Sequence, residues 1–578
     1  MKTFLKNYLL VFLIFMSASL LAGKVELAHI FSDNMVLQRE KPIKIWGTSN
    51  DSKTFEISFA DVKKNVKPNK DGKWKVEFPA MTAGGPYQIA VQSDSVFTLG
   101  NILIGDVWIC SGQSNMEWSM RQTYNSACEL ANANNENIRC FYVSKNMSEI
   151  PLSDFSWGKW NVATSENIAH ISAVAYFFAK NVYESENIPQ GIICTYWGGS
   201  PIEAWTSLES IETHEDYSEK IKEFKSKFGT AESFTNLKKT SEKEFEEWNN
   251  LIRPKDAGYE ERWYMPEYNT EDWHDMRVPG YWEYNGLPNY DGVVWLRKEL
   301  NIPASMVGKS LSLNLEILKD YDITWFNGVQ VGSVSWDKGR RTYYIPASLI
   351  HEGKNVITVR VENKFGLGGF TSLNESDIFI REMIGEQVLS IPLAGKWKYK
   401  SSLNKDEYPP QPQNKVSINT PSCLYNGMIA PITDLSIKGA IWYQGESNSW
   451  RAYQYRTLFP LMINDWRRQF KQGDFPFLFV QLAGFDGITK EPQESTWAEL
   501  REAQTMTLSV VNTGMAVAID LGNPYDVHPT NKQEVGRRLA VEAQKLVYGK
   551  SQLTTSPIYQ NMLIDGNKII LSFSNAKN

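Results

Sequence analysis

Two segments that lie far apart in the chain carry side chains that together could hydrolyse an ester. Ser114 lies in the sequence Gly-Gln-Ser-Asn, directly after the short apolar run 106–110. His528 lies in the sequence Asp-Val-His-Pro, two residues after Asp526. A serine nucleophile needs a base that removes its proton and a carboxylate that orients this base. We therefore expect Ser114, His528 and Asp526 to form a catalytic triad.

The backbone around these residues favours a tight turn at the serine and a loop at the histidine. Gly112 has no Cβ that would crowd a turn, so the chain can present Ser114. Pro529 disfavours the helical conformation at the residue before it, His528. Side chains two residues apart can meet in a loop but not on a regular helix. A loop would therefore let Asp526 reach His528.

Hydrolysis through a serine also needs donors for the oxyanion of the tetrahedral intermediate. The backbone N–H of Ser114 is one candidate. A backbone N–H in the turn Gly198-Gly199 is the second, because glycine lets the backbone approach a ligand closely, and we take Gly199. The third is a side-chain amide, either Gln444 or Asn448, of which we take Gln444.

Two glutamates near these residues offer a different chemistry. Glu117 and Glu446 could act as the paired carboxylates of a glycosidase. Their alternative role is to hydrogen-bond backbone amides in the loops of the site. We favour this supporting role because it is compatible with a catalytic function of the serine and histidine segments, which a glycosidase would not explain. With Asn115, Gly198 and Asn448, these glutamates form the predicted set of residues that support the site loops.

The candidate residues follow a regular alternation of apolar strands and amphipathic helices. Strands are predicted at 106–110, 191–196, 440–443, 477–481 and 516–519, and helices at 171–184, 497–509 and 531–548. Such alternation predicts an α/β domain with a parallel sheet covered on both faces. Each candidate residue comes just after a predicted strand, where open parallel sheets place their sites.

The rest of the chain consists of β-rich segments and charged helices. Short alternating runs between turns predict antiparallel β domains, and Asn327-Gly328 predicts a tight hairpin in one of them. The lysine- and glutamate-rich stretch 206–256 predicts solvated helices. The expected order is an N-terminal β domain at 24–100, the first part of the α/β domain at 101–256, an inserted β-sandwich at 257–400, the second part at 401–550 and the start of a further β element at 551–578.

The N-terminus has the composition of a secretory signal. Lys2 and Lys6 precede the apolar run 8–16, and small residues lead up to Ala22. We expect cleavage after Ala22, so residues 1–22 are a predicted signal peptide. The apolar run is short for a bilayer span, so we prefer cleavage to a membrane anchor. We predict an exported protein, periplasmic or extracellular, without stable membrane insertion.

Composition limits the partners and cofactors. The 578 residues carry a net charge of −6 without a basic run, which argues against nucleic acid. Six histidines are present without clustering, and no cysteine pair has zinc-site spacing, so we predict no metal and no other cofactor. Of the five cysteines, Cys110 and Cys194 lie in apolar runs typical of a core. Cys128 and Cys140 are a candidate disulfide pair that sequence leaves open.

Four motifs in this order resemble the sialate O-acetylesterase branch of the SGNH hydrolases. They are Gly-Gln-Ser-Asn-Met-Glu-Trp from Gly112, Gly-Gly-Ser-Pro-Ile-Glu-Ala-Trp from Gly198, Trp-Tyr-Gln-Gly-Glu-Ser-Asn from Trp442 and Asp-Val-His-Pro from Asp526. The resemblance implies a three-layer, flavodoxin-like α/β sheet, the Ser114–His528–Asp526 triad and metal-free removal of O-acetyl groups from carbohydrates. The inserted segment resembles the jelly-roll sugar-binding domains of many glycoside hydrolases.

The chain departs from the wider superfamily at three positions of the site. The nucleophile lies in Gly-Gln-Ser, where most relatives have Gly-Asp-Ser. The acidic residue stands two positions before the histidine, where three is usual. Gln444 stands where an asparagine is usual, which leaves the side-chain oxyanion donor open.

The identity of the acetylated sugar is open at the level of sequence. Sialic acid acetylated at the 9-O position, acetylated xylan and other acetylated plant or host glycans all fit the predicted chemistry. A glycosidase and a glycan-binding protein with an inactive site are the alternatives from other classes. The sequence carries no signal for protein partners or for the oligomeric state.

Overall fold

The computed structural model of the chain describes residues 25–94, 96–228, 231–334, 340–371, 374–382, 389–407, 409, 412, 417–485, 487, 491, 493–524, 526–550, 557–574 and 576. The predicted signal peptide, residues 1–22, lies outside the described residues. Contacts between residues divide the chain into two compact units, one made of residues up to 235 and from 416 onward, the other of residues 236–415. The second unit extends beyond the predicted insert at both ends.

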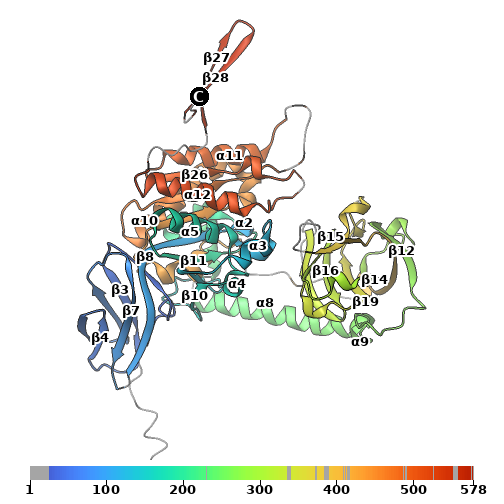
Figure 1. Cartoon of the computed structure of the whole chain (residues 1–578), viewed down its shortest axis with the longest axis horizontal. Helices are drawn as coiled ribbons and strands as arrows, with labels where there is room; N and C mark the ends of the chain where they lie inside the picture. Colours follow the sequence, from blue (N-terminus) through green and yellow to red (C-terminus); the bar gives the residue numbers. More distant parts are fainter. Residues whose placement is uncertain are drawn as a thin grey trace, which may run out of the picture. The chain divides into compact units, whose positions relative to one another are not determined.

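The first unit is built around a sheet of parallel strands (Figure 1). Strand β8 (Val96–Gly112) pairs in parallel with β11 (Gln190–Tyr196) on one side and with β24 (Gly439–Tyr443) on the other. The sheet continues in parallel through β9 (Asn135–Tyr142) beyond β11, and through β25 (Phe477–Gln481) and β26 (Thr513–Val517) beyond β24. Every residue of β11 and β24 is buried, as in sheets covered on both faces. The two sequence segments on either side of the insert therefore share one sheet.

Four long helices pack on this sheet: α5 (Ala173–Glu186), α10 (Ala452–Phe470), α11 (Thr496–Met506) and α12 (Lys532–Leu546). The ring of Trp442 packs against Trp466 of α10, whereas the ring of the next residue, Tyr443, lies near Lys532 of α12. Adjacent residues of a strand point to opposite faces, so α10 and α12 cover opposite faces of the sheet. Helix α5 packs beside α12, and α11 beside α10. The three predicted helices are confirmed to within a few residues.

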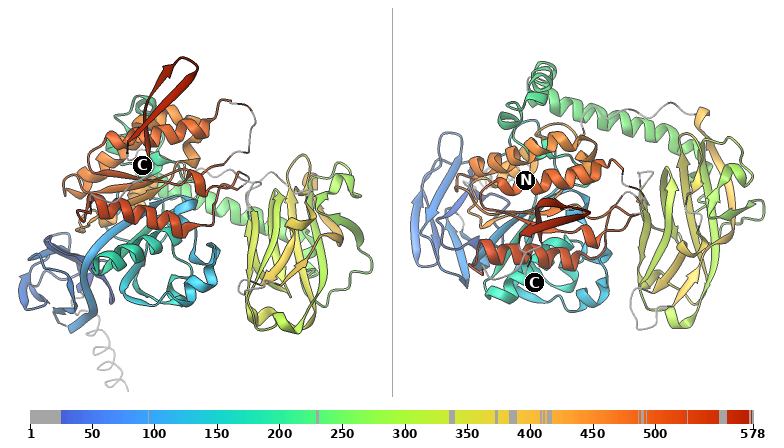
Figure 2. Two further views of the ribbon diagram at one scale, coloured as in Figure 1. Left: turned by 45° about the horizontal axis from the view of Figure 1, so that its top comes forward. Right: turned by 90° about the horizontal axis from the view of Figure 1, so that it is seen from above.

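Seven strands precede β8 in the described chain, three in a separate sheet and four joined to the first part of β8. They are β1 (Val25–Leu27), β3 (Ile43–Ser49) and β6 (Lys73–Phe78) in the separate sheet, and β2 (Val36–Gln38), β4 (Phe55–Phe59), β5 (Val62–Val66) and β7 (Gly84–Gln92) beside β8. The first part of β8 pairs antiparallel with β7, and its last part runs in the parallel sheet. Figure 2 shows this long strand in blue. One strand thus leads directly from the β region to the candidate nucleophile.

In its described residues, the second unit contains two antiparallel sheets of six strands each. The first sheet holds β12 (His274–Val278), β23 (Gly395–Asn404), β14 (Gly292–Ile302), β19 (Gly353–Asn363), β16 (Tyr321–Phe326) and β17 (Val329–Val334). The second holds β13 (Gly280–Tyr281), β20 (Gly369–Phe370), β15 (Leu311–Lys319), β21 (Phe379–Glu382), β22 (Ser390–Pro392) and β18 (Arg340–Ile345).

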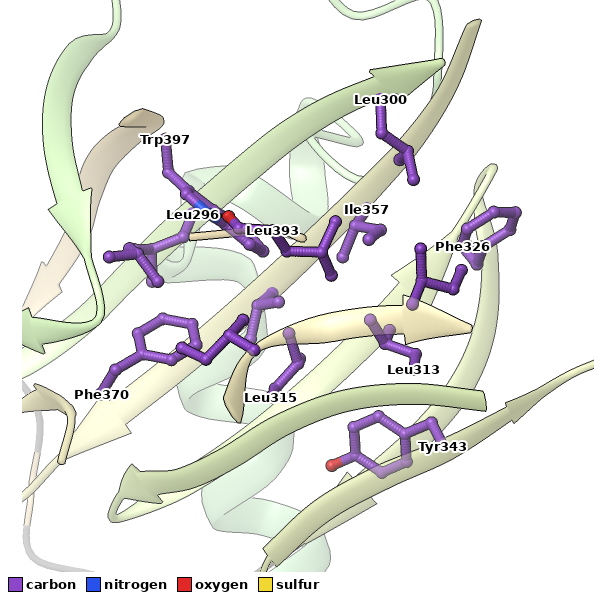
Figure 3. Close-up of a cluster of buried hydrophobic side chains, with 14 of the residues drawn as sticks. Leu296, Leu300, Leu313, Leu315, Phe326, Tyr343, Ile357, Phe370, Leu393 and Trp397 are labelled. Carbon is purple, nitrogen blue, oxygen red and sulfur yellow. Dashed lines mark hydrogen bonds between the residues drawn. The ribbon is translucent and has the colours of Figure 1, made fainter. Parts of the chain in front are cut away.

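A common apolar core joins these two sheets. Figure 3 shows Leu296 and Trp397 from the first sheet together with Leu313, Leu315 and Phe370 from the second. Two antiparallel sheets that bury their inner faces against each other form a β-sandwich. The predicted tight hairpin is confirmed between β16 and β17, where both central residues adopt positive φ, 48° at Asn327 and 80° at Gly328.

Two long charged helices and a C-terminal hairpin lie outside these sheets. Helices α7 (Glu215–Phe228) and α8 (Ala231–Ile252) occupy most of the charged stretch 206–256, and β27 (Ile558–Asp565) pairs antiparallel with β28 (Lys568–Ser574). Within the described residues, no helix combines the length and the apolar character needed to cross a membrane.

Candidate active site

The turn that carries Ser114 begins at the end of β8. Gly112 has a φ of +141°, and a Cβ at this position would lie 2.1 Å from the carbonyl oxygen of Tyr443 in the neighbouring strand β24. A side chain here would therefore clash with backbone, which explains the glycine. After Gln113 the chain enters helix α2 (Ser114–Glu117), whose first residue is Ser114. The Gln113 Oε1 accepts a hydrogen bond from the Ser447 N–H at 3.2 Å, which ties this turn to the next site loop.

The structure brings Ser114 and His528 together. His528 Nε2 lies 2.8 Å from Ser114 Oγ, within hydrogen-bond distance, although 414 positions separate the two residues in the chain. The imidazole also stacks on Trp118, with ring centroids 5.0 Å apart and an interplanar angle of 19°. The aromatic face of Trp118 restricts the orientation of the imidazole, so Nε2 points at the hydroxyl.

Asp526 lies beside His528 in the same loop. Its Oδ1 accepts the backbone N–H of His528 at 2.9 Å and stands 3.7 Å from Nδ1 of the ring. The first contact fixes the loop, and the second places a negative charge at ion-pair distance from the imidazole. The carboxylate is thus on the side of the ring that faces away from Ser114.

The environment of His528 disfavours its protonated form. Burial, and after it the positive charge of Lys532, lower the pKa of His528 to about 3. The imidazole is therefore neutral at ordinary pH, which is the state that can accept a proton.

The Gly198-Gly199 turn lies beside Ser114. A Cβ built on Gly198 would lie 3.4 Å from Ser114 Cβ, an ordinary van der Waals distance, so the two turns lie side by side. The Gly198 N–H donates to Glu117 Oε2 at 2.8 Å, and Glu117 Oε1 accepts from Lys145 Nζ at 2.5 Å. Among the described residues, the N–H groups of Ser114 and Gly199 have no hydrogen-bond acceptor. These two donors are available to a ligand at this position.

The predicted oxyanion role of Gln444 disagrees with the structure. Its Nε2 donates to Asn448 Oδ1 at 2.6 Å and to Ser200 O at 3.3 Å, and its Oε1 accepts from the Tyr455 hydroxyl at 2.9 Å. The side chain is fully buried. Both amide hydrogens are therefore already used, and the amide has none left for a substrate.

Asn448, the other amide candidate, is equally engaged. Its Oδ1 accepts from the Ile202 N–H at 3.0 Å, and its Nδ2 donates to Glu203 Oε2 at 3.1 Å. Gln444 and Asn448 thus connect two motifs, the one that begins at Gly198 and the one that begins at Trp442. Their contacts give both residues a structural role in the site loops.

The two glutamates of the glycosidase alternative are held by other groups. Glu117 binds the Gly198 N–H and Lys145, which agrees with the predicted role of supporting a backbone amide. Glu446 Oε1 accepts from Asn115 Nδ2 at 2.5 Å, and the backbone of Gly445 and Glu446 also hydrogen-bonds this carboxyl group. Burial raises the pKa of Glu446, and the Asn115 hydrogen bond opposes this shift. These contacts favour supporting roles for both carboxylates.

Two residues of the site were not among the predicted site residues. Trp118 stacks on His528, and Lys532 donates to Asn115 Oδ1 at 2.5 Å from the first turn of α12. An aromatic residue and a lysine at these positions are typical of a core and of an exposed helix surface. The sequence signals for them are the place of Trp118 in the motif that begins at Gly112 and the place of Lys532 four residues after His528, next to a helix start.

Neither a metal cluster nor a disulfide is present among the described residues. No group of three or more histidine, cysteine, aspartate or glutamate side chains there is arranged to hold a metal ion. All five cysteines are free thiols, with Cys128 exposed and the other four buried.

Comparison with known proteins gives a consistent result. The chain matches the family described as "Carbohydrate esterase, sialic acid-specific acetylesterase" over residues 104–235 and 414–545. Sialate O-acetylesterase from Homo sapiens is 24% identical over 95% of this chain and 76% of its own length. The Mus musculus protein of the same name is 25% identical over 91% of this chain and 74% of its own length.

A solved structure is similar over nearly the whole chain. A carbohydrate acetylesterase from Xanthomonas citri matches with a TM-score of 0.58 at 27% identity, covering 95% of this chain and 82% of that chain. The α/β fold and these relatives define a carboxylic ester hydrolase. These matches confirm the resemblance to the sialic acid-specific carbohydrate acetylesterases that the four motifs carry.

Proposed function

We propose that this protein is an exported serine esterase that removes O-acetyl groups from sugars. The observation that carries the proposal is the 2.8 Å contact between Ser114 Oγ and His528 Nε2 at the carboxyl ends of the parallel strands. The fold that we propose is the three-layer, flavodoxin-like fold of the SGNH hydrolases. The parallel sheet and the helices on its opposite faces support this assignment.

The first half of the reaction acylates the enzyme. The Ser114 hydroxyl donates to Nε2 of His528 and attacks the acetyl carbonyl carbon as the imidazole takes its proton. Asp526 stabilises the imidazolium and holds the loop through the His528 N–H. The N–H groups of Ser114 and Gly199 stabilise the oxyanion. When the tetrahedral intermediate collapses, His528 returns the proton to the departing sugar hydroxyl.

The second half regenerates the enzyme. Water attacks the acetyl group on Ser114 while His528 Nε2 accepts one of its protons. The new tetrahedral intermediate uses the same two backbone donors. Its collapse releases acetate and restores the Ser114 hydroxyl with the proton that His528 held. The side-chain amide of Gln444 takes no part in this scheme, because both of its hydrogens are bonded elsewhere.

The proposed substrate class is an acetylated glycan, with 9-O-acetylated sialic acid or a related sugar in first place. The names of the mammalian relatives support sialic acid, and that of the Xanthomonas citri enzyme supports carbohydrate acetyl esters in general. Acetylated xylan or another plant glycan is the alternative for the same mechanism. The predicted signal peptide supports export to the periplasm or the medium.

Replacement of Ser114 tests the proposal directly. Ser114→Ala removes the nucleophile and leaves the fold intact, so we expect the acetate release from 9-O-acetylated sialic acid and from a chromogenic acetate ester to fall by at least about a thousandfold. Ser226→Ala, at an exposed position of α7, is the matched control and keeps full activity. Full activity of Ser114→Ala would exclude the mechanism. Acetate release from acetylated xylan but not from acetylated sialic acid would show that the proposed substrate is wrong, while the proposed mechanism would stand.

A further inference from the structure

Lys532 is a fully buried lysine beside the candidate active site. Lysine is almost never buried completely unless a partner holds its ammonium group. Here Nζ donates to Asn115 Oδ1 at 2.5 Å. It also lies over two aromatic rings, 5.3 Å from the centre of Tyr443 and 5.6 Å from that of Trp118. The lysine thus sits under the nucleophile turn and close to the ring that stacks on His528.

The partner of Lys532, Asn115, connects three segments of the site. Its Nδ2 donates to the carbonyl oxygen of Val527 at 2.9 Å and to Glu446 Oε1 at 2.5 Å. Val527 directly precedes His528, so one hydrogen of the Asn115 amide anchors the loop that carries the base. Asn115 itself directly follows Ser114. The side chain therefore sets the distance between the nucleophile segment and the base segment.

Lys532 fixes the orientation of the Asn115 amide. An asparagine amide can turn over and exchange its oxygen and nitrogen. If Asn115 did so, its oxygen would face two acceptors, the Val527 carbonyl and the Glu446 carboxyl group, and its NH₂ group would face an ammonium group. The Lys532 ammonium group on one side and the two acceptors on the other therefore favour one orientation of the Asn115 amide. In this orientation the amide NH₂ group donates to the Val527 carbonyl oxygen.

We propose that Lys532 is a positioning residue of the active site, which locks Asn115 and thereby holds His528 in reach of Ser114. This inference rests on the proposed roles of Ser114 as nucleophile and His528 as base. Lys532 does not touch the reacting atoms and acts through Asn115 and through its charge. The charged groups that face it are Glu446 from the neighbouring loop and Asp526 from the loop of the base.

The charge of Lys532 has a second effect, on the protonation of His528. Burial lowers the pKa of His528 first, and the positive charge of Lys532 lowers it further. Burial lowers the pKa of Lys532 itself to about 7, opposed by Glu446 and Asp526, so the lysine carries its charge over the acid limb. Loss of this charge removes the second cause, so the pKa of His528 rises. The base is then protonated at a higher pH, and the acid limb of kcat/KM moves to higher pH. A role in folding alone would lower activity at every pH without moving this limb.

Lys532→Met removes the charge and keeps the length of the side chain. With a chromogenic acetate ester we expect kcat to fall roughly tenfold to a hundredfold because the base is less well placed, while KM stays within about twofold. We also expect the acid limb of kcat/KM to move up by roughly one pH unit. Lys532→Arg keeps the charge and should leave the limb at its wild-type position. Lys545→Met, the same change in the last turn of α12, is the control and should match the wild type.

A second variant covers the case in which Lys532→Met does not fold. Asn115→Asp keeps an oxygen for Lys532 but replaces two donor contacts by contacts between oxygen atoms. We expect it to lower kcat at least about tenfold and to lower the melting temperature as well, because two buried acceptors lose their donor. In the double variant Asn115→Asp/Lys532→Met the losses should not multiply, because both changes break the same link.

The outcomes separate this inference from the proposed function. If Ser114→Ala abolishes activity while Lys532→Met or Asn115→Asp keeps wild-type kcat and the wild-type acid limb, the positioning role is wrong and the serine mechanism stands. If the losses of the single variants multiply in the double variant, Lys532 does not act through Asn115. If Ser114→Ala retains activity, the proposed function fails, and the inference fails with it.

Discussion

At the scale of single residues, the two ring nitrogens of His528 differ in how closely they contact their partners. His528 Nε2 is within hydrogen-bond distance of Ser114, whereas Nδ1 stands 3.7 Å from Asp526 Oδ1. The same oxygen holds the backbone N–H of His528 at 2.9 Å. Catalytic hydrogen bonds in ligand-free enzymes are often long and tighten when the substrate binds. In the proposed mechanism Asp526 therefore fixes the loop at rest and acts on the ring once imidazolium forms.

The pH dependence of the wild-type enzyme follows from the largely buried environment of His528. Its pKa is lowered from the ordinary 6.5 to about 3, by burial and by Lys532. The base is thus neutral well below pH 6.5, and we expect kcat/KM to stay nearly constant between pH 7 and pH 5. Between pH 6.5 and 3, His528 binds a proton in the unfolded chain but stays neutral in the folded chain. The free energy of unfolding should therefore fall as the pH drops from 6.5 toward 3. An acid limb of kcat/KM centred near 6.5 would contradict this environment for His528.

At the scale of elements, the end of β8 determines where the nucleophile lies. Gly112→Ala places a Cβ 2.1 Å from the Tyr443 carbonyl oxygen, at a φ of +141°. The strand pair β8–β24 must then separate at its site end. We expect a loss of about 3 kcal/mol or more in stability, together with most of the activity, measured by denaturant unfolding and ester hydrolysis.

A matched glycine separates the clash from the effect of positive φ. Gly473 has a φ of +70°, and a Cβ there would meet nothing within 4 Å. Gly473→Ala should therefore cost only about 1 kcal/mol and leave activity unchanged. Equal losses for the two glycine variants would show that the close approach of β24 is not the reason for Gly112.

The elements and the ends of the strands could be predicted from the sequence, because both depend on local patterns. The helix 171–184 and the strand 440–443 follow from the spacing of apolar residues, and the Asn327-Gly328 hairpin follows from its turn residues. The meeting of Ser114 and His528 followed from a rule of topology, since both come after strands of one parallel sheet.

The partners of the polar side chains could not be predicted in the same way. The Gln444 amide donates to Asn448 and Ser200, and only the folded chain brings these acceptors close to it. Lys532 has the sequence context of an exposed residue in a first helical turn, yet it is buried because Asn115 and two aromatic rings surround it. Such contacts depend on tertiary packing, which the local periodicity of the sequence does not report.

At the scale of the whole molecule, the chain forms two compact units with separate apolar cores. The core of the sandwich in residues 236–415 draws on both of its sheets, as Leu296 and Leu315 illustrate. The core of the other unit surrounds the parallel sheet and includes Ile441 of β24. Because each unit has its own core, each can unfold in its own cooperative transition.

Matched core variants should separate the two transitions. Leu315→Ala and Ile441→Ala each remove a fully buried side chain, which typically costs about 2–5 kcal/mol. In calorimetry we expect Leu315→Ala to lower the melting temperature of one transition and Ile441→Ala that of the other. Loss of ester hydrolysis on heating should follow the transition that Ile441→Ala moves, since Ser114 and His528 lie in that unit. A single transition lowered by both variants would mean that the two cores unfold as one.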